Sequence, residues 1–225
     1  MAYVELSYLV NEKTPNYPDA PKDRVIPLER QSQGDSGNTS VIHHFAHNGT
    51  HLDTPFHFDS QGKQIQDLAF DNFIYHNPVF LEIPKNYQEE ISLSDLHKFD
   101  ISRADAVLIR TGFDEIRNKE PLAYRILFPG LSLETAEYLR NSCKNLKAVL
   151  VDFLSVDSLF SGRRNGYPVH HALLDSGASP RPPVLIIEDV NMRPLVHKRL
   201  KRVFALPIRF EGAEAAPVCV AAEIE

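Results

Sequence analysis

The sequence holds only two cysteines, Cys143 and Cys219, and they lie far apart in the chain. This spacing gives no disulfide framework, so we expect reduced thiols and a cytoplasmic protein. Because the chain also has no Cys-x-x-Cys pair, any metal site must use nitrogen and oxygen ligands. That ligand set favours zinc or manganese over iron–sulfur chemistry.

The sequence also lacks long apolar runs and an excess of positive charge. No run approaches the ~20 apolar residues that cross a bilayer. The N-terminal segment has no basic leader followed by an apolar stretch, so we expect neither a membrane span nor a signal peptide. The net charge of −6, with neutral histidines, provides no basic field for nucleic acid.

The chain shows no internal repeat, low-complexity tract or linker, and its 225 residues predict a single domain, 1–225. Segments rich in β-branched residues predict strands over 3–10, 25–28, 39–45, 79–83, 106–110, 147–151, 184–187, 203–210 and 217–222. Short helices are predicted over 66–73, 92–98, 132–143 and 167–177. Strands outnumber helices in a mixed order, which indicates an α/β or α+β class.

The densest chemistry lies in residues 47–57. Four side chains there can bind a metal or move a proton: His47, His51, Asp53 and His57. A straight strand would separate His47 from His51 by about 13 Å, whereas imidazole nitrogens bind zinc at about 2.0–2.1 Å. Gly49 and Pro55 make a poor helix interior. We therefore predict an extended segment, bent at Gly49 and turned at Pro55, with its polar side chains pointing inward.

Further ligands must come from distant parts of the sequence. The best pair is His170 and Glu188, with His171 as the substitute for His170. A carboxylate at the end of a buried strand requires a partner or a cation. The simpler alternatives are a salt bridge for Glu188 and an ordinary helix-start histidine for either imidazole. Residues 152–157 are either structural or a support for the site.

The run from His47 to His57 resembles the His-x-Gly-Thr-His-x-Asp-x-Pro-x-His signature of the cyclase-like metal-dependent hydrolases. This superfamily includes bacterial kynurenine formamidase and isatin hydrolase. Segments 105–113, 151–157 and 170–174 also look like family segments in family order, so the resemblance covers nearly the whole chain. It implies a swivelling β/β/α domain with a mixed sheet and few helices. It also implies a homodimer or larger homo-oligomer, and one or two zinc or manganese ions.

The resemblance assigns metal binding to these residues: His47, His51, Asp53, His170 and Glu188. His57 looks like the catalytic acid/base. Glu188 follows His170 by 18 residues, a longer interval than in the relatives that the motif suggests. The extra residues look like a proline-rich insertion over Ser179–Pro183 that leaves Glu188 intact. The longer interval keeps the choice between His170 and His171 open.

The predicted activity is hydrolysis of an amide, a cyclic amide or an ester through a metal-activated water. We expect the chain to turn at Pro55 and to leave His57 out of reach of the first ion, free to move a proton. The resemblance favours an aryl formamide such as N-formylkynurenine. The alternatives are a metal-dependent cyclase or dehydratase acting on a polyketide-like substrate, and a catalytically inactive metal-binding relative. Aromatic side chains near the motif could line a pocket or belong to the core: Tyr17, Phe45, Phe56 and Phe58.

Overall fold

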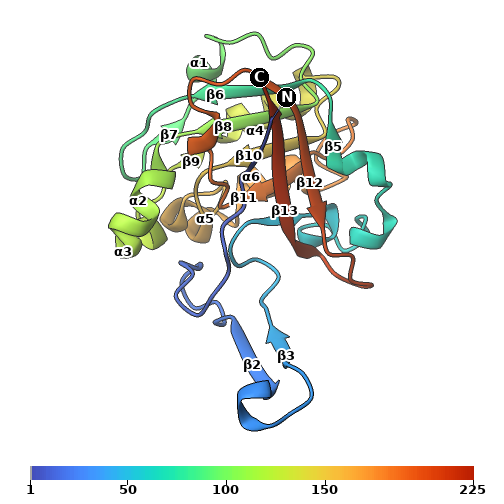
Figure 1. Ribbon diagram of the computed structural model, residues 1–225. Helices are drawn as coiled ribbons and strands as arrows, with labels where there is room; N and C mark the ends of the chain where they lie inside the picture. Colours follow the sequence, from blue (N-terminus) through green and yellow to red (C-terminus); the bar gives the residue numbers. More distant parts are fainter. Residues whose placement is uncertain (1) are drawn as a thin grey trace.

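The structure, a computed structural model, describes residues 2–225. Its main element is a mixed sheet with the strand order β5-β12-β13-β4-β11-β10-β8-β6, in which β1 also pairs with β13 (Figure 1). The strands are β1 (Ala2–Glu5), β4 (His51–Asp53), β5 (Ile74–Tyr75), β6 (Pro78–Glu82), β8 (Ala106–Arg110), β10 (Ala148–Val151), β11 (Leu185–Glu188), β12 (Leu200–Pro207) and β13 (Ala215–Ile224). The α/β class expected from the sequence is confirmed.

One half of the sheet is parallel and covered on both faces. Strands β6, β8, β10 and β11 run in the same direction. In β8, Val107 and Ile109 join the core cluster that includes the helices, whereas Ala106 and Leu108 join the cluster on the opposite face. Burial on both faces explains why these strands are almost continuously apolar.

Short helices supply the cover on one face. Their bounds are α1 (Leu93–Leu96), α2 (Phe113–Lys119), α3 (Pro121–Ile126), α4 (Leu133–Ser142), α5 (Leu159–Asn165) and α6 (Pro168–Leu174). A small parallel pair, β7 (Glu90–Ile91) and β9 (Gly130–Leu131), lies outside the main sheet. Within residues 2–225, no helix has the length and apolar character needed to cross a membrane.

The antiparallel half begins at β4, which pairs antiparallel with both β11 and β13. β13 also pairs with β12 and β1, which brings the two ends of the chain together (Figure 1). The histidine-rich motif therefore lies at the junction between the two halves, in the middle of the sheet.

A two-stranded arm extends away from this body (Figure 1). It consists of β2 (Arg24–Glu29) and β3 (Thr39–His43), joined by a tip with a 3-10 helix over Gln31–Gln33. Every residue of both strands is exposed. These strands agree with the prediction, and the tip between them contains one helical turn.

Three differences from the predicted elements have local causes. The predicted helix over 66–73 is two 3-10 turns, Ile65–Asp67 and Phe70–Phe73, because Leu68 and Ala69 are extended between them. The first strand ends at Glu5, and the chain then turns toward the motif, where the Tyr8 amide donates to Thr50 Oγ1. Helices α2, α3 and α5, of six or seven residues each, were not predicted.

Candidate metal centre

Strand β4 presents two polar side chains on one face and an apolar one on the other. Alternation places His51 and Asp53 together, while Leu52 is fully buried in the core. In the antiparallel pairing with β11, Glu188 lies directly opposite His51. The register of two strands thus brings the motif and the distant glutamate to the same face.

The four central groups are close enough to share cations. His51 Nε2 lies 3.4 Å from Glu188 Oε2 and 3.5 Å from Asp53 Oδ1. His170 Nε2 lies 3.8 Å from Asp53 Oδ2 and 3.6 Å from Glu188 Oε1. All four side chains are at most 5% exposed. The structure therefore brings together residues that are distant in the sequence.

His47 and His57 reach the same cluster because the chain bends on both sides of β4. Gly49 has φ +64°, and a Cβ there would lie 3.0 Å from Val10 Cγ2, so a glycine suits the bend. After β4, the 3-10 turn Pro55–His57 folds back and places the ring centroids of His47 and His57 4.2 Å apart. The expectation that a turn at Pro55 keeps His57 out of reach was wrong, because this turn directs it inward.

Two groups of three side chains could each hold a metal ion. The atoms of His47, Asp53 and His57 lie within 4.8 Å of one another, and so do those of His51, Asp53 and Glu188. Among residues 2–225, His51 Nε2 and both Asp53 oxygens are buried and form no hydrogen bond of good geometry, although His47 Nδ1 lies 2.9 Å from Asp53 Oδ1. Buried polar atoms of this kind need a partner. A divalent cation would satisfy all three, so the residues present fit a metal.

Hydrogen bonds orient several of the candidate ligands. Asp157 Oδ2 lies 2.7 Å from His170 Nδ1 and accepts a hydrogen bond from the His170 amide. The Val156 amide donates to Glu188 Oε1 at 2.8 Å, and His51 Nδ1 lies 2.9 Å from the Gly49 carbonyl. Partners on one nitrogen fix the ring and leave the other nitrogen for a metal. Of the two roles considered for residues 152–157, Asp157 has the supporting one.

The charges in the cluster shift its pKa values in opposite directions. Burial alone would lower the pKa of His47, but the neighbouring Asp53 and Glu214 carboxylates raise it to about 10. Burial would also lower the pKa of His170, but Asp157 and Glu188 raise it to about 10. Burial lowers the pKa of His57 to about 4, with His47 and His170 adding to the effect against Asp53. The His57 ring is thus neutral near pH 7.

A pocket of about 270 Å³ opens onto the cluster. Its aromatic lining comprises Tyr17, Phe45, Phe58 and Tyr167. Phe58 stacks on His170 with 4.7 Å between ring centroids. Of the aromatic residues considered from the sequence, Phe56 is not among the lining residues, and Tyr167 was missed. His171 lies outside the lining with a side chain 48% exposed, next to Asp175.

Asp189, directly after Glu188, is a second residue that the sequence did not suggest. Its backbone has a left-handed φ of +52°, and the residue is fully buried. Its carboxylate accepts two hydrogen bonds of 2.7 Å from the Arg117 guanidinium and one from Tyr124. Its carbonyl accepts a hydrogen bond from Thr50 Oγ1, next to His51. This network ties the backbone of Glu188 to the motif.

Glu214 is the third missed residue. Its Oε1 lies 3.2 Å from His47 Nε2, and its carbonyl accepts hydrogen bonds from the backbone and side chain of Thr54. Strand pairing sets this position, since Ala215 lies opposite Asp53. A glutamate in the turn before the last strand carries no recognisable signal in the sequence.

Comparisons with known proteins identify the family of the chain. Residues 4–158 match the model of the family described as "Putative cyclase", and the chain belongs to that family. Proteins named kynurenine formamidase from Bacillus thuringiensis (strain Al Hakam) and Bacillus cytotoxicus are each 28% identical over 217 residues, which span 96% of this chain and 94% of theirs.

Solved structures extend the similarity to the fold. An isatin hydrolase bound to the product analogue thioisatinate matches with a TM-score of 0.84 at 16% identity, over 99% of this chain and 92% of its own. Isatin hydrolase A from Ralstonia solanacearum has a TM-score of 0.79 at 18% identity, over 100% of this chain and 92% of its own. A potential metal-dependent hydrolase with cyclase activity has a TM-score of 0.73 at 22% identity, over 98% and 96%. Together with the formamidase relatives, these similarities support a hydrolase.

Proposed function

We propose that this protein is a metal-dependent amidohydrolase that cleaves an aryl formamide, with N-formylkynurenine as the leading substrate. One observation carries the proposal: a buried cluster with unsatisfied ligand atoms lies at the end of an aromatic pocket. Aromatic walls suit a flat ring beside a scissile amide. The formamidase relatives align along 96% of the chain, so the same substrate class is the natural candidate.

The ligands of the proposed centre are His47, His51, Asp53, His170 and Glu188. One or two zinc or manganese ions there would supply an activated water and a Lewis acid for the substrate carbonyl. Nitrogen and oxygen donors of this kind suit both metals.

His57 is the proposed acid/base. Its pKa, which burial lowers to about 4, keeps the ring neutral near pH 7, so it can take a proton from the attacking water. Protonated His57 would then pass this proton to the departing amine. Its ring lies beside those of His47 and His170, with centroids at 4.2 and 5.8 Å, and so belongs at the reaction centre.

Metal analysis combined with an activity assay tests the proposal. The metal content of the purified protein would be measured by elemental analysis, and N-formylkynurenine hydrolysis would be followed with and without chelator. We expect one or two equivalents of zinc or manganese and turnover that the chelator abolishes. Metal without turnover would move the search to lactams and lactones, and absence of metal after reloading would overturn the proposal.

The cyclase or dehydratase alternative uses the same residues without net hydrolysis. Running the reaction in ¹⁸O-labelled water separates the two, because only hydrolysis places solvent oxygen in the acid product. An inactive relative would bind metal and show no turnover with amides, lactams or esters.

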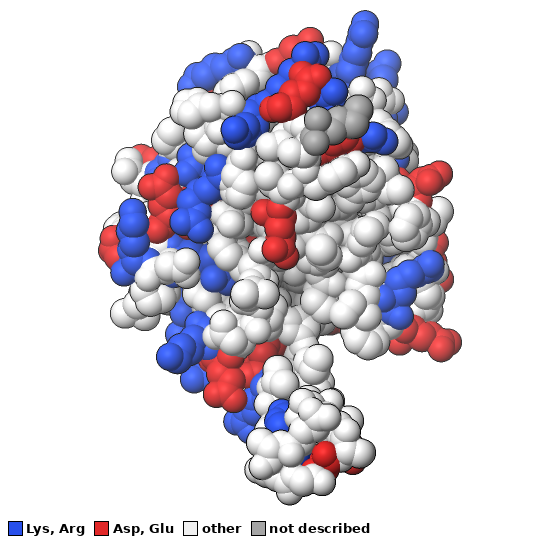
Figure 2. Space-filling model, viewed as in Figure 1, with Lys and Arg blue, Asp and Glu red and all other residues white. Residues whose placement is uncertain are grey.

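We further propose that two copies of the chain form a homodimer through the arm. Apolar side chains on both arm strands are exposed, among them Val25 (58%), Leu28 (64%) and Ile42 (73%). Figure 2 shows that much of the arm surface is uncharged. The groove at its base, about 640 Å³, is lined by apolar residues of arm and body, including Ile42, Ile208 and Phe210.

A two-stranded hairpin is marginal by itself, and a twofold axis would let each arm cover the apolar groove of the other copy. Light scattering should therefore give twice the chain mass for the wild type and a monomer for Ile42→Asp. A wild type that stays monomeric at micromolar concentration would refute the arm contact.

The free thiols Cys143 and Cys219 are compatible with the cytoplasmic location that we propose.

A further inference from the structure

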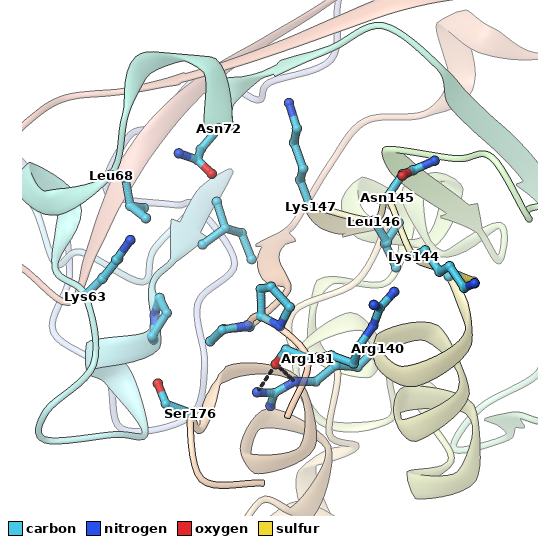
Figure 3. A pocket seen from close by; sticks show the side chains of 15 residues that line it. Lys63, Leu68, Asn72, Arg140, Lys144, Asn145, Leu146, Lys147, Ser176 and Arg181 are labelled. Atoms are coloured by element: carbon cyan, nitrogen blue, oxygen red, sulfur yellow. Dashed lines mark hydrogen bonds between the residues drawn. The ribbon is translucent and has the colours of Figure 1, made fainter. Parts of the chain in front are cut away.

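A second pocket lies at the opposite end of the central strands from the candidate metal centre. It adjoins Lys147 and Leu185, at the start of β10 and β11, whereas Glu188 is at the end of β11. Its volume is about 340 Å³. Figure 3 shows Lys63 on one side of the space and Arg140 and Lys144 on the other.

The lining of this pocket carries charge of one sign. Its basic residues are Lys63, Arg140, Lys144, Lys147 and Arg181. Among the residues described, 2–225, the lining includes no aspartate or glutamate, although the whole chain has a net charge of −6. The remaining polar groups include Asn72 and Ser176. Such a concentration of cations favours an anion.

Backbone carbonyls, rather than carboxylates, hold the most buried of these cations. Arg140, 2% exposed, donates through its guanidinium to the carbonyls of Ala172 and Asp175 and to that of Arg181, the last drawn in Figure 3. The first two are at the end of α6. This arrangement fixes Arg140 at the floor of the pocket.

Arg181 provides an unused donor. Its Nη2 is buried and has no hydrogen-bond partner among residues 2–225. Its backbone is held in place, because its amide donates to Ser179 Oγ, which donates in turn to Asn141 of α4. Arg181 belongs to the proline-rich segment Ser179–Pro183, which the metal centre does not use. A buried guanidinium nitrogen without a partner suits an incoming oxyanion.

We propose that this pocket binds a small oxyanionic molecule, one carrying a phosphate or carboxylate group, at a site separate from the metal centre. Arg181 contacts the anion directly, Lys63 closes over it from the opposite side, and Arg140 and Lys147 supply the surrounding positive field. The size of the pocket is at the lower end of the range for small-molecule sites. The proposal does not depend on the chemistry at the metal centre.

Calorimetric titration of the metal-loaded protein with inorganic phosphate, and separately with succinate, tests this proposal. The two probes distinguish a phosphate-bearing ligand from a carboxylate-bearing one. We expect saturable binding of one equivalent of at least one probe, weakening as sodium chloride is added. Arg181→Gln should weaken it by about tenfold or more, since it removes a charged hydrogen bond. The Arg181 carbonyl, which Arg140 uses, is unchanged by this substitution.

Two further variants complete the test. Lys63→Gln alters an exposed side chain and should also weaken binding, whereas Arg103→Gln, an exposed arginine outside the pocket, should leave it unchanged. Equal affinity in wild type and Arg181→Gln would place the anion elsewhere and overturn the proposal. Absence of saturable binding of both probes would also overturn it.

Discussion

Replacing Arg117 by Met should weaken metal binding as well as the fold. Asp189 is fully buried and its carboxylate receives both Arg117 hydrogen bonds at 2.7 Å, so the substitution leaves a buried charge with Tyr124 as its remaining side-chain donor. Removing one partner of a buried ion pair costs about 3–5 kcal/mol. For a chain of this size that corresponds to a fall in melting temperature of about 6–20 °C.

The effect on metal follows from the position of Asp189 in the chain. Its left-handed backbone immediately follows Glu188 and is held by the Thr50 hydroxyl and by the Phe153 carbonyl. Without the arginine, this conformation loses its strongest restraint, and the glutamate shifts with it. Loss of such supporting contacts typically lowers metal affinity about 10–100-fold. We expect this loss of affinity for the metal ion that Glu188 would bind.

Competition with a chromogenic chelator, at a temperature where both proteins are folded, measures this affinity. Arg199→Met is the matched control, because Arg199 pairs with Glu225 on the surface, where their side chains are 79% and 42% exposed. An exposed pair of this kind contributes about 0–1 kcal/mol. An Arg117→Met protein that is less stable yet binds metal as tightly as the wild type would refute the reasoning, since the network would then serve the fold alone.

Three further predictions test other parts of the site. His57→Ala should retain metal but lose about 10²–10⁴-fold in activity, whereas His51→Ala should lose metal. Elemental analysis measures the metal content of both variants, and equal metal loss in the two would show that His57 is a ligand. Chelation should lower the melting temperature reversibly, because metal at 1,000 times its Kd stabilises the fold by about 4 kcal/mol; an unchanged melting curve would contradict this. Burial, with a contribution from Asp114, raises the pKa of Asp152 to about 6, above its unfolded value. Its stabilising contribution is therefore full below pH ~4 and lost as the pH rises through 6. The unfolding free energy of wild type minus that of Asp152→Asn should fall by about 3 kcal/mol between pH 4 and 7 in urea titrations; a constant or rising difference would contradict the assignment.

The sequence predicted the strands of the sheet well because burial on both faces leaves an unbroken apolar pattern. The runs at β8, β10 and β11 were found within one or two residues of their ends. Helix α2 was missed because its start depends on a distant group. Buried Asp152 accepts hydrogen bonds from the backbone of Thr111 and Gly112, where α2 begins, and no local pattern reports such a contact.

For the candidate site, the motif identified the residues but did not predict how they are arranged in space. Spacing showed that His47 and His51 need a bend between them, and Gly49 provides it. Spacing could not show the direction of the turn after Pro55, which the structure sends back toward His47. The sequence could not predict the position of Glu214, because that position depends on the register between β13 and β4. Only the folded sheet fixes this register.

The segment Ser179–Pro183, interpreted from the sequence as an insertion, lies where it does not disturb the proposed centre. The segment Ser179–Pro183 enters before β11 begins, and β11 is held in register by β10 on one side and β4 on the other. Glu188 takes its position from its pairing opposite His51, so added length at the other end of the strand does not shift it. Arg181 is placed instead by its contacts with α4 and is free to serve a different ligand. The same strand thus separates the two sites, and substitutions at Arg181 should leave the metal content unchanged.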